Sequence, residues 1–285
     1  MASQGSNLQS SAPGRLEGKV AIVTGGASGI GESTVRLFVE NGAVVVIADI
    51  QDDRGSTLVG ELGPHIVAYR HCNVSIERDM ENLVKFTLDK WGKLDIMFNN
   101  AGILGKSMTS DATNVDMDDF DHVMSVNVRG IVLGVKYASK AMVGANIKGS
   151  IICTSSVAGI QGGVASMAYV VSKHAILGIM RAACSDLGQY GIRVNCVSPS
   201  AAITPLSLSF FRQALSNPLL DKESIQGILD NNHNLVGHSL STLDIAFASL
   251  YLASDDSKFV SGLNLVVDGG TSSTSQMFKH LTCGQ

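Results

Sequence analysis

A tyrosine, a lysine and a serine in this chain have the types and spacing of a proton-transfer site. Tyr169 and Lys173 lie four residues apart in the segment MAYVVSKHAI, and Ser156 precedes the tyrosine by thirteen residues. Residues four apart share one face of a helix, so an ammonium would lie beside a phenol. The phenol has an ordinary pKa of about 10, and a nearby cation lowers that value. Ser156 can donate a hydrogen bond to a substrate oxygen on which charge develops.

A glycine-rich turn near the N-terminus predicts a nucleotide site beside these residues. The segment TGGASGIG follows the apolar run KVAIVT and precedes a helical pattern at about 29–41. Gly25, Gly29 and Gly31 permit a tight turn and let a pyrophosphate approach the backbone. The following helix directs its N-terminal N–H groups and the positive end of its dipole at the phosphates. Together with the tyrosine and lysine, this turn indicates a bound nicotinamide nucleotide.

The end of the next apolar run indicates which nucleotide is bound. Asp49 ends AVVVIAD, eighteen residues after Gly31. A carboxylate there accepts hydrogen bonds from the adenosine ribose hydroxyls and repels a 2′-phosphate, so we expect NAD rather than NADP. Arg54 is the nearby cation that would favour NADP, and we interpret it as a solvated residue at a helix start. NNAG (99–102) ends a later run, where small residues leave room for the adenosine, although such segments are also ordinary turns.

The elements that must position these residues alternate along the chain. We expect strands at 19–24, 43–49, 65–72, 94–100, 149–155, 192–199 and 263–270, with helix-length segments between them. Continuous apolar strands alternating with helices indicate a parallel sheet covered on both faces, and right-handed crossovers make it doubly wound. We therefore predict an α/β protein with one Rossmann-like domain of about seven strands at 17–270. Within it, 203–241 contains no clear strand and is expected to be a helical substrate flap.

Composition limits the partners of this domain. The chain has 285 residues, a net charge of −4 and 45% hydrophobic residues, so neither nucleic acid nor an anionic membrane is expected as a partner. No apolar run approaches the roughly 18 residues of a membrane helix. Five scattered cysteines without metal-ligand spacing indicate a reducing, cytoplasmic compartment and no metal site. Residues 1–16 are polar and are expected to be a disordered tail, and 271–285 a second tail.

The motifs taken together resemble those of the short-chain dehydrogenase/reductase family. The similarity runs from about residue 17 to 270 and includes TGGASGIG, the acidic residue after AVVVIA, NNAG, SVNV, YVVSK, VNCVSPS and LVVDGG. It implies that Tyr169 is the general acid/base and that Lys173 binds the nicotinamide ribose and tunes the tyrosine. It also implies that Ser156 orients the substrate oxygen and that Asn127 holds a water linking Lys173 to solvent. Asn127 is equally interpreted as a polar residue at a helix irregularity.

The resemblance also implies a set of cofactor contacts. Ile203 and Thr204 would contact the nicotinamide amide. The full set expected to contact NAD is Gly25, Ser28, Gly29, Ile30, Gly31, Asp49, Asn73, Val74, Asn100, Ala101, Gly102, Tyr169, Lys173, Pro199, Ile203 and Thr204. Family members often have aspartate in place of Asn73, which predicts altered adenine binding. They commonly have glycine in place of Ser200, which predicts a repositioned loop. Gly237 and His238 also depart from the family pattern, and no function is assigned to them.

The substrate pocket is expected after the fourth, fifth and sixth strands and under the flap. Its candidate residues are Ile103, Leu104, Ile160, Gln161, Met167, Leu206, Phe210 and Phe211. A mostly apolar pocket suits a compact lipophilic alcohol or ketone. NNAGILG and YVVSKHAILG resemble the plant branch of the family, which includes borneol, isopiperitenol, secoisolariciresinol and xanthoxin dehydrogenases and nepetalactol-related enzymes. The resemblance therefore implies NAD-dependent oxidation of a secondary alcohol or lactol on a monoterpenoid substrate, borneol- or nepetalactol-like.

Other functions stay open at this point. One is a non-redox cyclase or isomerase of an iridoid precursor that keeps NAD bound, another is a lignan or apocarotenoid alcohol dehydrogenase, and a third is a non-catalytic nucleotide sensor. The intact set of Ser156, Tyr169 and Lys173 argues against the cyclase. The resemblance also implies a homotetramer formed through the helices that carry Asn127 and Tyr169, with which the apolar stretch 131–143 is compatible.

Overall fold

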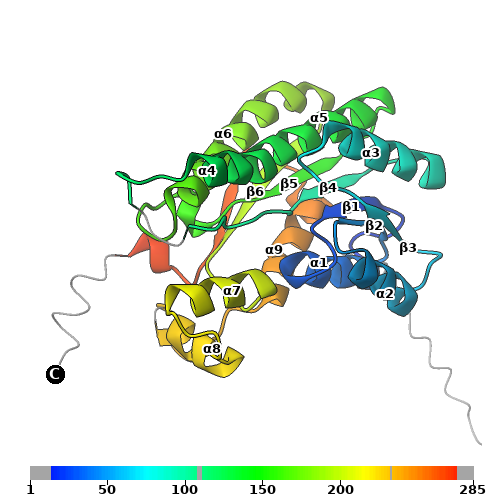
Figure 1. Cartoon of the computed structure of the whole chain (residues 1–285). Helices are drawn as coiled ribbons and strands as arrows, with labels where there is room; N and C mark the ends of the chain where they lie inside the picture. Colours follow the sequence, from blue (N-terminus) through cyan, green and yellow to red (C-terminus); the bar gives the residue numbers. More distant parts are fainter. Residues whose placement is uncertain (1–13, 108–110, 232, 275–285) are drawn as a thin grey trace, which may run out of the picture.

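A seven-stranded parallel sheet forms the centre of the computed structural model, which describes residues 14–107, 111–231 and 233–274 (Figure 1). The strands follow the order β3-β2-β1-β4-β5-β6-β7. They are β1 (Val20–Thr24), β2 (Val44–Asp49), β3 (Val67–His71), β4 (Ile96–Asn99), β5 (Ser150–Thr154), β6 (Arg193–Pro199) and β7 (Asn264–Val267). Each lies within a run that the sequence predicts as a strand. The order changes direction between β1 and β4, which confirms the predicted doubly wound α/β fold.

Helices cover both faces of the sheet (Figure 1). They are α1 (Gly29–Glu40), α2 (Asp52–Leu62), α3 (Glu77–Trp91), α4 (Met117–Met124), α5 (Gly130–Gly144), α6 (Met167–Leu187), α7 (Pro205–Ala214), α8 (Lys222–Asn231) and α9 (Thr242–Ala253). Alternate strand residues enter different cores: Ile22 packs with α3, α5 and α6, whereas Val23 packs with α1, α2 and α9. The strands are apolar along their whole length because both faces are buried.

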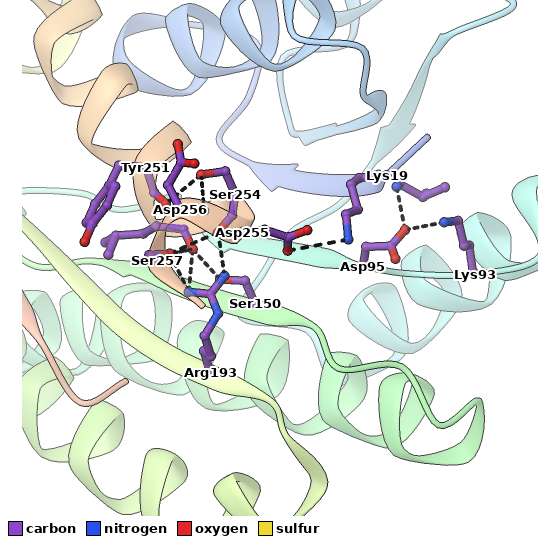
Figure 2. A network of polar contacts seen from close by, with 12 residues as sticks. Lys19, Lys93, Asp95, Ser150, Arg193, Tyr251, Ser254, Asp255, Asp256 and Ser257 are labelled. Carbon is purple, nitrogen blue, oxygen red and sulfur yellow. Dashed lines mark hydrogen bonds and ion pairs between the residues drawn. The ribbon is translucent and has the colours of Figure 1, made fainter. Parts of the chain in front are cut away.

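The last turn of α9 is tied to the sheet by Arg193 of β6. Its guanidinium donates to the carbonyl oxygen of Leu252 at 2.8 Å, to Ser257 Oγ at 2.7 Å and to the carbonyl oxygen of Ser254 at 3.2 Å (Figure 2). Ser150 of β5 donates to the same Leu252 oxygen at 2.8 Å. The last carbonyls of a helix have no partner within the helix, and a cation there also complements the helix dipole.

The domain begins earlier than the sequence predicts. Leu16 is fully buried among the apolar residues on the α1 side, and its main-chain nitrogen donates to the carbonyl oxygen of Asn41 at 2.9 Å. Arg15 forms an ion pair with Asp256. The predicted boundary of the disordered tail at residue 16 is therefore wrong, because one buried leucine in a polar segment gives no periodic signal. Residues 1–13 of that tail and residues 275–285 of the C-terminal tail lie outside the described residues.

The predicted flap is helical. Within the described part of 203–241, the chain forms α7 and α8 and no strand. Thr204 caps α7 by accepting a hydrogen bond from the Ser207 main-chain nitrogen at 3.1 Å, and Pro205 occupies the first turn. Gln213 on the same helix donates to the carbonyl oxygen of Lys106 at 3.3 Å. The helix α7 therefore extends from the end of β6 to the loop after β4.

Two further properties follow from the described residues. None of their helices combines the length and the apolar character that a membrane span requires.

Four cysteines among the described residues carry free thiols. Cys72, Cys153 and Cys196 are buried and Cys184 is half-buried, as expected for small apolar residues. Cys283 lies outside the described residues.

Candidate active site

A cavity of about 760 Å³ opens at the carboxyl ends of the strands and contains most of the predicted site. Ser156, Tyr169 and Lys173 line it at one side, and Asp49 and the glycine turn line it at another. All predicted cofactor contacts line this cavity except Gly31 and Ile203. The parallel sheet brings these segments together because every strand ends at the same edge.

The glycine turn has the geometry of a phosphate cradle. Gly25 and Gly29 have φ angles of 63° and 57°, which favour glycine, and a Cβ on Gly25 would lie 2.9 Å from the Cα of Ala101. Ser28 precedes α1, but its side chain does not cap the helix, so the first N–H groups stay available to an anion. A Cβ on Gly31 would lie 2.0 Å from the carbonyl oxygen of Gly25. Gly31 therefore packs the helix against the turn and does not line the cavity, and its part in binding the dinucleotide stays a prediction.

The carboxylate of Asp49 is held in place by main-chain donors. Its Oδ2 accepts from Ala27 N at 3.0 Å, and its Oδ1 accepts from Ile50 N at 2.8 Å and from the main-chain and side-chain nitrogens of Gln51 at 3.1 and 3.2 Å. The residue is buried, with 6% of its surface exposed. Arg54 is exposed and does not line the cavity, in agreement with its interpretation as a solvated helix-start residue.

Tyr169 and Ser156 form the centre of the chemical half of the cavity. Tyr169 is half-buried in the first turn of α6. Ser156 is the second residue after the end of β5. Burial raises the pKa of Tyr169 to about 12, and a hydrogen bond with Ser156 lowers it in part. The hydroxyl is therefore protonated at neutral pH in the protein alone, and further positive charge is needed before the phenolate forms that accepts a proton.

Lys173 lies beside the Tyr169 ring but is anchored by a hydrogen bond to the end of β5. Its Nζ donates to the carbonyl oxygen of Thr154 at 2.9 Å and lies 5.3 Å from the centre of the Tyr169 ring, over the ring face. The lysine is 3% exposed, and burial lowers its own pKa to about 8. The predicted tuning of the tyrosine by the lysine stays a prediction.

Asn127 lies at a helix irregularity and fixes the loop after β4. It belongs to a π-helical turn, Ser125–Arg129, between α4 and α5. Its Oδ1 accepts from the main-chain nitrogen of Ile103, and its Nδ2 donates to the carbonyl oxygen of Ile103, both at 2.8 Å. The same Nδ2 donates to Ser172 Oγ at 3.0 Å. Asn127 is fully buried and positions the backbone of Ile103, and its role in a water relay stays a prediction.

The substrate side of the cavity is apolar, although its lining differs from the predicted set. Ile103, Leu104, Leu206, Phe210 and Phe211 line it. Ile160, Gln161 and Met167 do not, and placing them there was wrong. Gln161 instead donates to the carbonyl oxygen of Ser272 at 3.4 Å, because the loop after β5 turns toward the C-terminal segment. Sequence reasoning missed Val126, Val157 and Val164, which also line the cavity and carry no motif.

The departures from the family pattern have local partners. Asn73 lines the cavity, and its Oδ1 accepts from the main-chain nitrogen and the hydroxyl of Ser75 at 3.1 and 2.8 Å. Ser200 also lines the cavity, and its hydroxyl lies 3.4 Å from Nε2 of the buried His233. Ile203, two residues further along, lies outside the cavity lining, so its predicted contact with the cofactor is not supported by its position.

The comparisons with known proteins agree with this geometry. Residues 25–272 match the family model described as enoyl-(acyl carrier protein) reductase, so the matched region spans the glycine turn, Ser156, Tyr169 and Lys173. The chain belongs to the short-chain dehydrogenase/reductase family. This confirms the resemblance drawn from the motifs, and it makes the protein an oxidoreductase. Short-chain dehydrogenases/reductases bind NAD or NADP, and the glycine turn, the uncapped start of α1 and Asp49 fit such a dinucleotide.

Several curated members of the family are similar over nearly their whole length. Momilactone A synthase of Oryza sativa is 48% identical over 277 residues, which cover 96% of this chain and 97% of that protein. (+)-Borneol dehydrogenase 2 of Salvia officinalis is 46% identical over 278 residues, with coverage of 96% and 97%. Secoisolariciresinol dehydrogenase of Forsythia intermedia is 44% identical over 265 residues and covers 93% of each chain.

A solved structure of the family supports the fold. The crystal structure of levodione reductase superposes with a TM-score of 0.81 at 30% identity, covering 91% of this chain and 100% of that chain. The order and packing of the elements described above are therefore those of a short-chain dehydrogenase/reductase.

Proposed function

We propose that the protein oxidises a secondary alcohol or a lactol of a small lipophilic molecule, with NAD as the hydride acceptor. The observation that carries the proposal is that Ser156, Tyr169 and Lys173 line the same cavity as Asp49 and the glycine turn. A proton acceptor and a dinucleotide site in one cavity are the parts that such an oxidation needs.

In the proposed reaction the substrate loses one hydride from its carbinol carbon and one proton from its hydroxyl group. NAD, when bound, supplies a cationic nicotinamide ring that takes up the hydride from the carbinol carbon. Ser156 donates a hydrogen bond to the substrate oxygen, and the Tyr169 phenolate accepts the hydroxyl proton, so a ketone or lactone is formed. Because the pKa of Tyr169 is about 12 in the protein alone, the charges of the ring and of Lys173 together must favour the phenolate.

NAD is proposed over NADP because of the charge near the adenosine end. The Asp49 carboxylate is buried there and fixed by the Ala27, Ile50 and Gln51 donors. A 2′-phosphate would meet this negative charge, whereas ribose hydroxyls would donate to it. Initial rates with NAD and NADP at matched concentrations test the preference. Equal efficiency with the two cofactors would overturn this part of the proposal.

A monoterpenoid substrate is proposed from the pocket and from the relatives. The apolar lining, with the Phe210 and Phe211 rings at an edge-to-face distance of 5.3 Å, suits a compact hydrocarbon frame with one oxygen. One similar protein is named a borneol dehydrogenase, which supports a bicyclic monoterpenoid alcohol. The test uses racemic borneol and nepetalactol with NAD, and follows NADH absorbance and product structure. A cyclised product without NADH formation would favour a non-redox cyclase instead. Turnover of lignan or apocarotenoid alcohols alone would show that the enzyme is a lignan or apocarotenoid alcohol dehydrogenase.

A homotetramer is proposed for the working enzyme. Its support is that Val132 of α5 and Val171 of α6 are large apolar residues with 45% and 39% of their surface exposed, on the helices expected to form the interface. Sedimentation of the purified enzyme at micromolar concentration is expected to give a tetramer. A monomer under those conditions would remove the proposal.

A further inference from the structure

We propose that Tyr69, His71 and Asp52 form a positioning cluster that holds the turn between β2 and α2 in the shape required by the adenosine half of the dinucleotide. The proposal rests on dinucleotide binding at Asp49, as proposed above. It concerns side chains that do not line the cavity themselves and act through the turn.

The turn needs such support because the helix that follows it has no side-chain cap. Asp49, Ile50 and Gln51 line the cavity, and α2 begins directly afterwards, at Asp52. Gln51 occupies the cap position, but its side chain makes no capping hydrogen bond. It donates instead to Asp49 Oδ1 at 3.2 Å and to Ser28 Oγ at 3.4 Å. The course of the turn therefore depends on contacts from outside the helix.

The Tyr69 hydroxyl joins the two ends of the turn. Its oxygen lies 2.7 Å from the carbonyl oxygen of Asp49, the last residue of β2, and 2.5 Å from Oδ1 of Asp52, the first residue of α2. The same Asp49 carbonyl accepts from the main-chain nitrogen of Cys72 at 3.0 Å. One phenol on the neighbouring strand β3 thus contacts both the strand end and the helix start.

His71 completes the cluster from the end of β3. It lies opposite Asp49 in the sheet register, and its Nδ1 is 2.7 Å from Asp52 Oδ1. Hydrogen bonds from Tyr69 and His71 lower the pKa of Asp52, and burial together with Asp52 raises the pKa of Tyr69. At neutral pH the aspartate is therefore an ionised acceptor and the tyrosine a protonated donor, which suits their contacts.

The position of the Tyr69 ring is fixed by a glycine on α2. A Cβ on Gly55 would lie 2.1 Å from Cδ2 of the ring, so the ring packs directly on the helix backbone one turn after Asp52. This packing leaves the hydroxyl at the start of the helix. Removal of the hydroxyl alone keeps the ring in contact with Gly55 and removes only the link between Asp49 and Asp52.

The cluster acts on binding and not on the chemical step. The turn that it holds lines the cavity after β2, whereas Ser156 follows β5 and Tyr169 lies in α6. Loss of the link is therefore expected to weaken ADP-ribose and to raise KM for NAD, while kcat at saturating NAD stays unchanged. A merely structural role would lower kcat and the melting temperature as well.

The test compares Tyr69→Phe and His71→Asn with the control Tyr190→Phe, which changes an exposed tyrosine outside the cavity. Calorimetry with ADP-ribose is expected to show a Kd raised about 3- to 10-fold in the first two variants, the size expected for one lost hydrogen bond, and unchanged in the control. A Kd within twofold of the parent in both variants, or an equal loss of kcat, would overturn the proposal. Failure of the parent protein to bind ADP-ribose would instead contradict dinucleotide binding itself.

Discussion

The ammonium of Lys173 lies over the face of the Tyr169 ring, 5.3 Å from its centre, and donates its hydrogen bond to the carbonyl oxygen of Thr154. The two residues share a helix face, as their spacing requires, but the lysine is anchored to the end of β5. This arrangement holds the ammonium beside the tyrosine in the wall of the cavity. Burial has moved both pKa values away from their ordinary range, upward for the tyrosine and downward for the lysine.

The lowered pKa of Lys173 predicts a pH-dependent stability. Its pKa is about 8 in the folded protein and 10.5 ordinarily, so the unfolded chain binds the proton more tightly and stability rises with pH through that window. Between pH 8 and 9.5, the free energy of unfolding of the parent should gain about 1–2 kcal/mol relative to Lys173→Met. The raised pKa of Tyr169 acts only above its ordinary value of 10.

Urea denaturation of the cofactor-free protein at several pH values measures this difference. Lys258→Met, at an exposed lysine, is the matched control and should follow the parent. Parallel pH profiles for the parent and Lys173→Met would contradict the buried position assigned to the lysine.

Gly31→Ala should disrupt the phosphate cradle. The added Cβ would lie 2.0 Å from the carbonyl oxygen of Gly25, so the turn or the start of α1 must shift. We expect dinucleotide affinity to fall at least about tenfold, since backbone donors to the phosphates lose their alignment. Gly60→Ala, on the exposed side of α2 where a Cβ meets nothing within 4 Å, should leave affinity unchanged and stabilise the protein by about 0.5–1 kcal/mol. Equal affinities of the two variants, measured by NADH fluorescence titration, would show that the close packing at Gly31 is irrelevant.

Asp49→Asn should weaken the discrimination between the two nicotinamide cofactors. The amide keeps the size of the carboxylate but loses the charge that repels a 2′-phosphate. The ratio of kcat/KM for NAD to that for NADP should fall about tenfold or more, which corresponds to about 1.4 kcal/mol. Asp53→Asn, on the exposed start of α2, is the control and should keep the parent ratio. A ratio that stays at the parent value in Asp49→Asn would remove Asp49 as the source of the preference.

Phe210→Ala should enlarge the substrate side of the cavity. The ring lines the cavity and packs edge-to-face on Phe211, so its removal takes apolar contact from the substrate and from its neighbour. KM for a small lipophilic alcohol should rise about tenfold, while Kd for NADH stays within twofold. Phe259→Ala, at a fully exposed ring, should change neither value. An unchanged KM in Phe210→Ala would place the substrate elsewhere.

The sequence predicted the fold well because the signals involved are local. Runs such as KVAIVT and AVVVIAD are apolar along their whole length, which only a strand buried on both faces tolerates. The glycine turn, Asp49, Ser156, Tyr169 and Lys173 were all placed in one cavity, since the ends of parallel strands meet at one edge of the sheet. The burial of Leu16 was not predicted because a single buried residue in a polar segment has no periodicity.

What the sequence missed depends on tertiary packing. Gln161 contacts Ser272 and Val164 lines the cavity because of the direction that the loop after β5 takes, which the sequence does not show. Burial raises the pKa of Tyr169 and lowers that of Lys173, and burial is a property of the folded chain that these motifs do not show. A helix irregularity was one of two interpretations of Asn127, whereas its two hydrogen bonds to the backbone of Ile103 have no signature in the sequence.

The most direct test of the account is the Tyr169→Phe variant, assayed for NADH formation and for NADH binding in parallel. Turnover should fall roughly 10²–10⁴-fold, the usual contribution of a general acid–base group, while Kd for NADH stays within a few-fold of the parent. Turnover at the parent rate with binding intact would contradict the assignment of the Tyr169 hydroxyl as the group that accepts the proton.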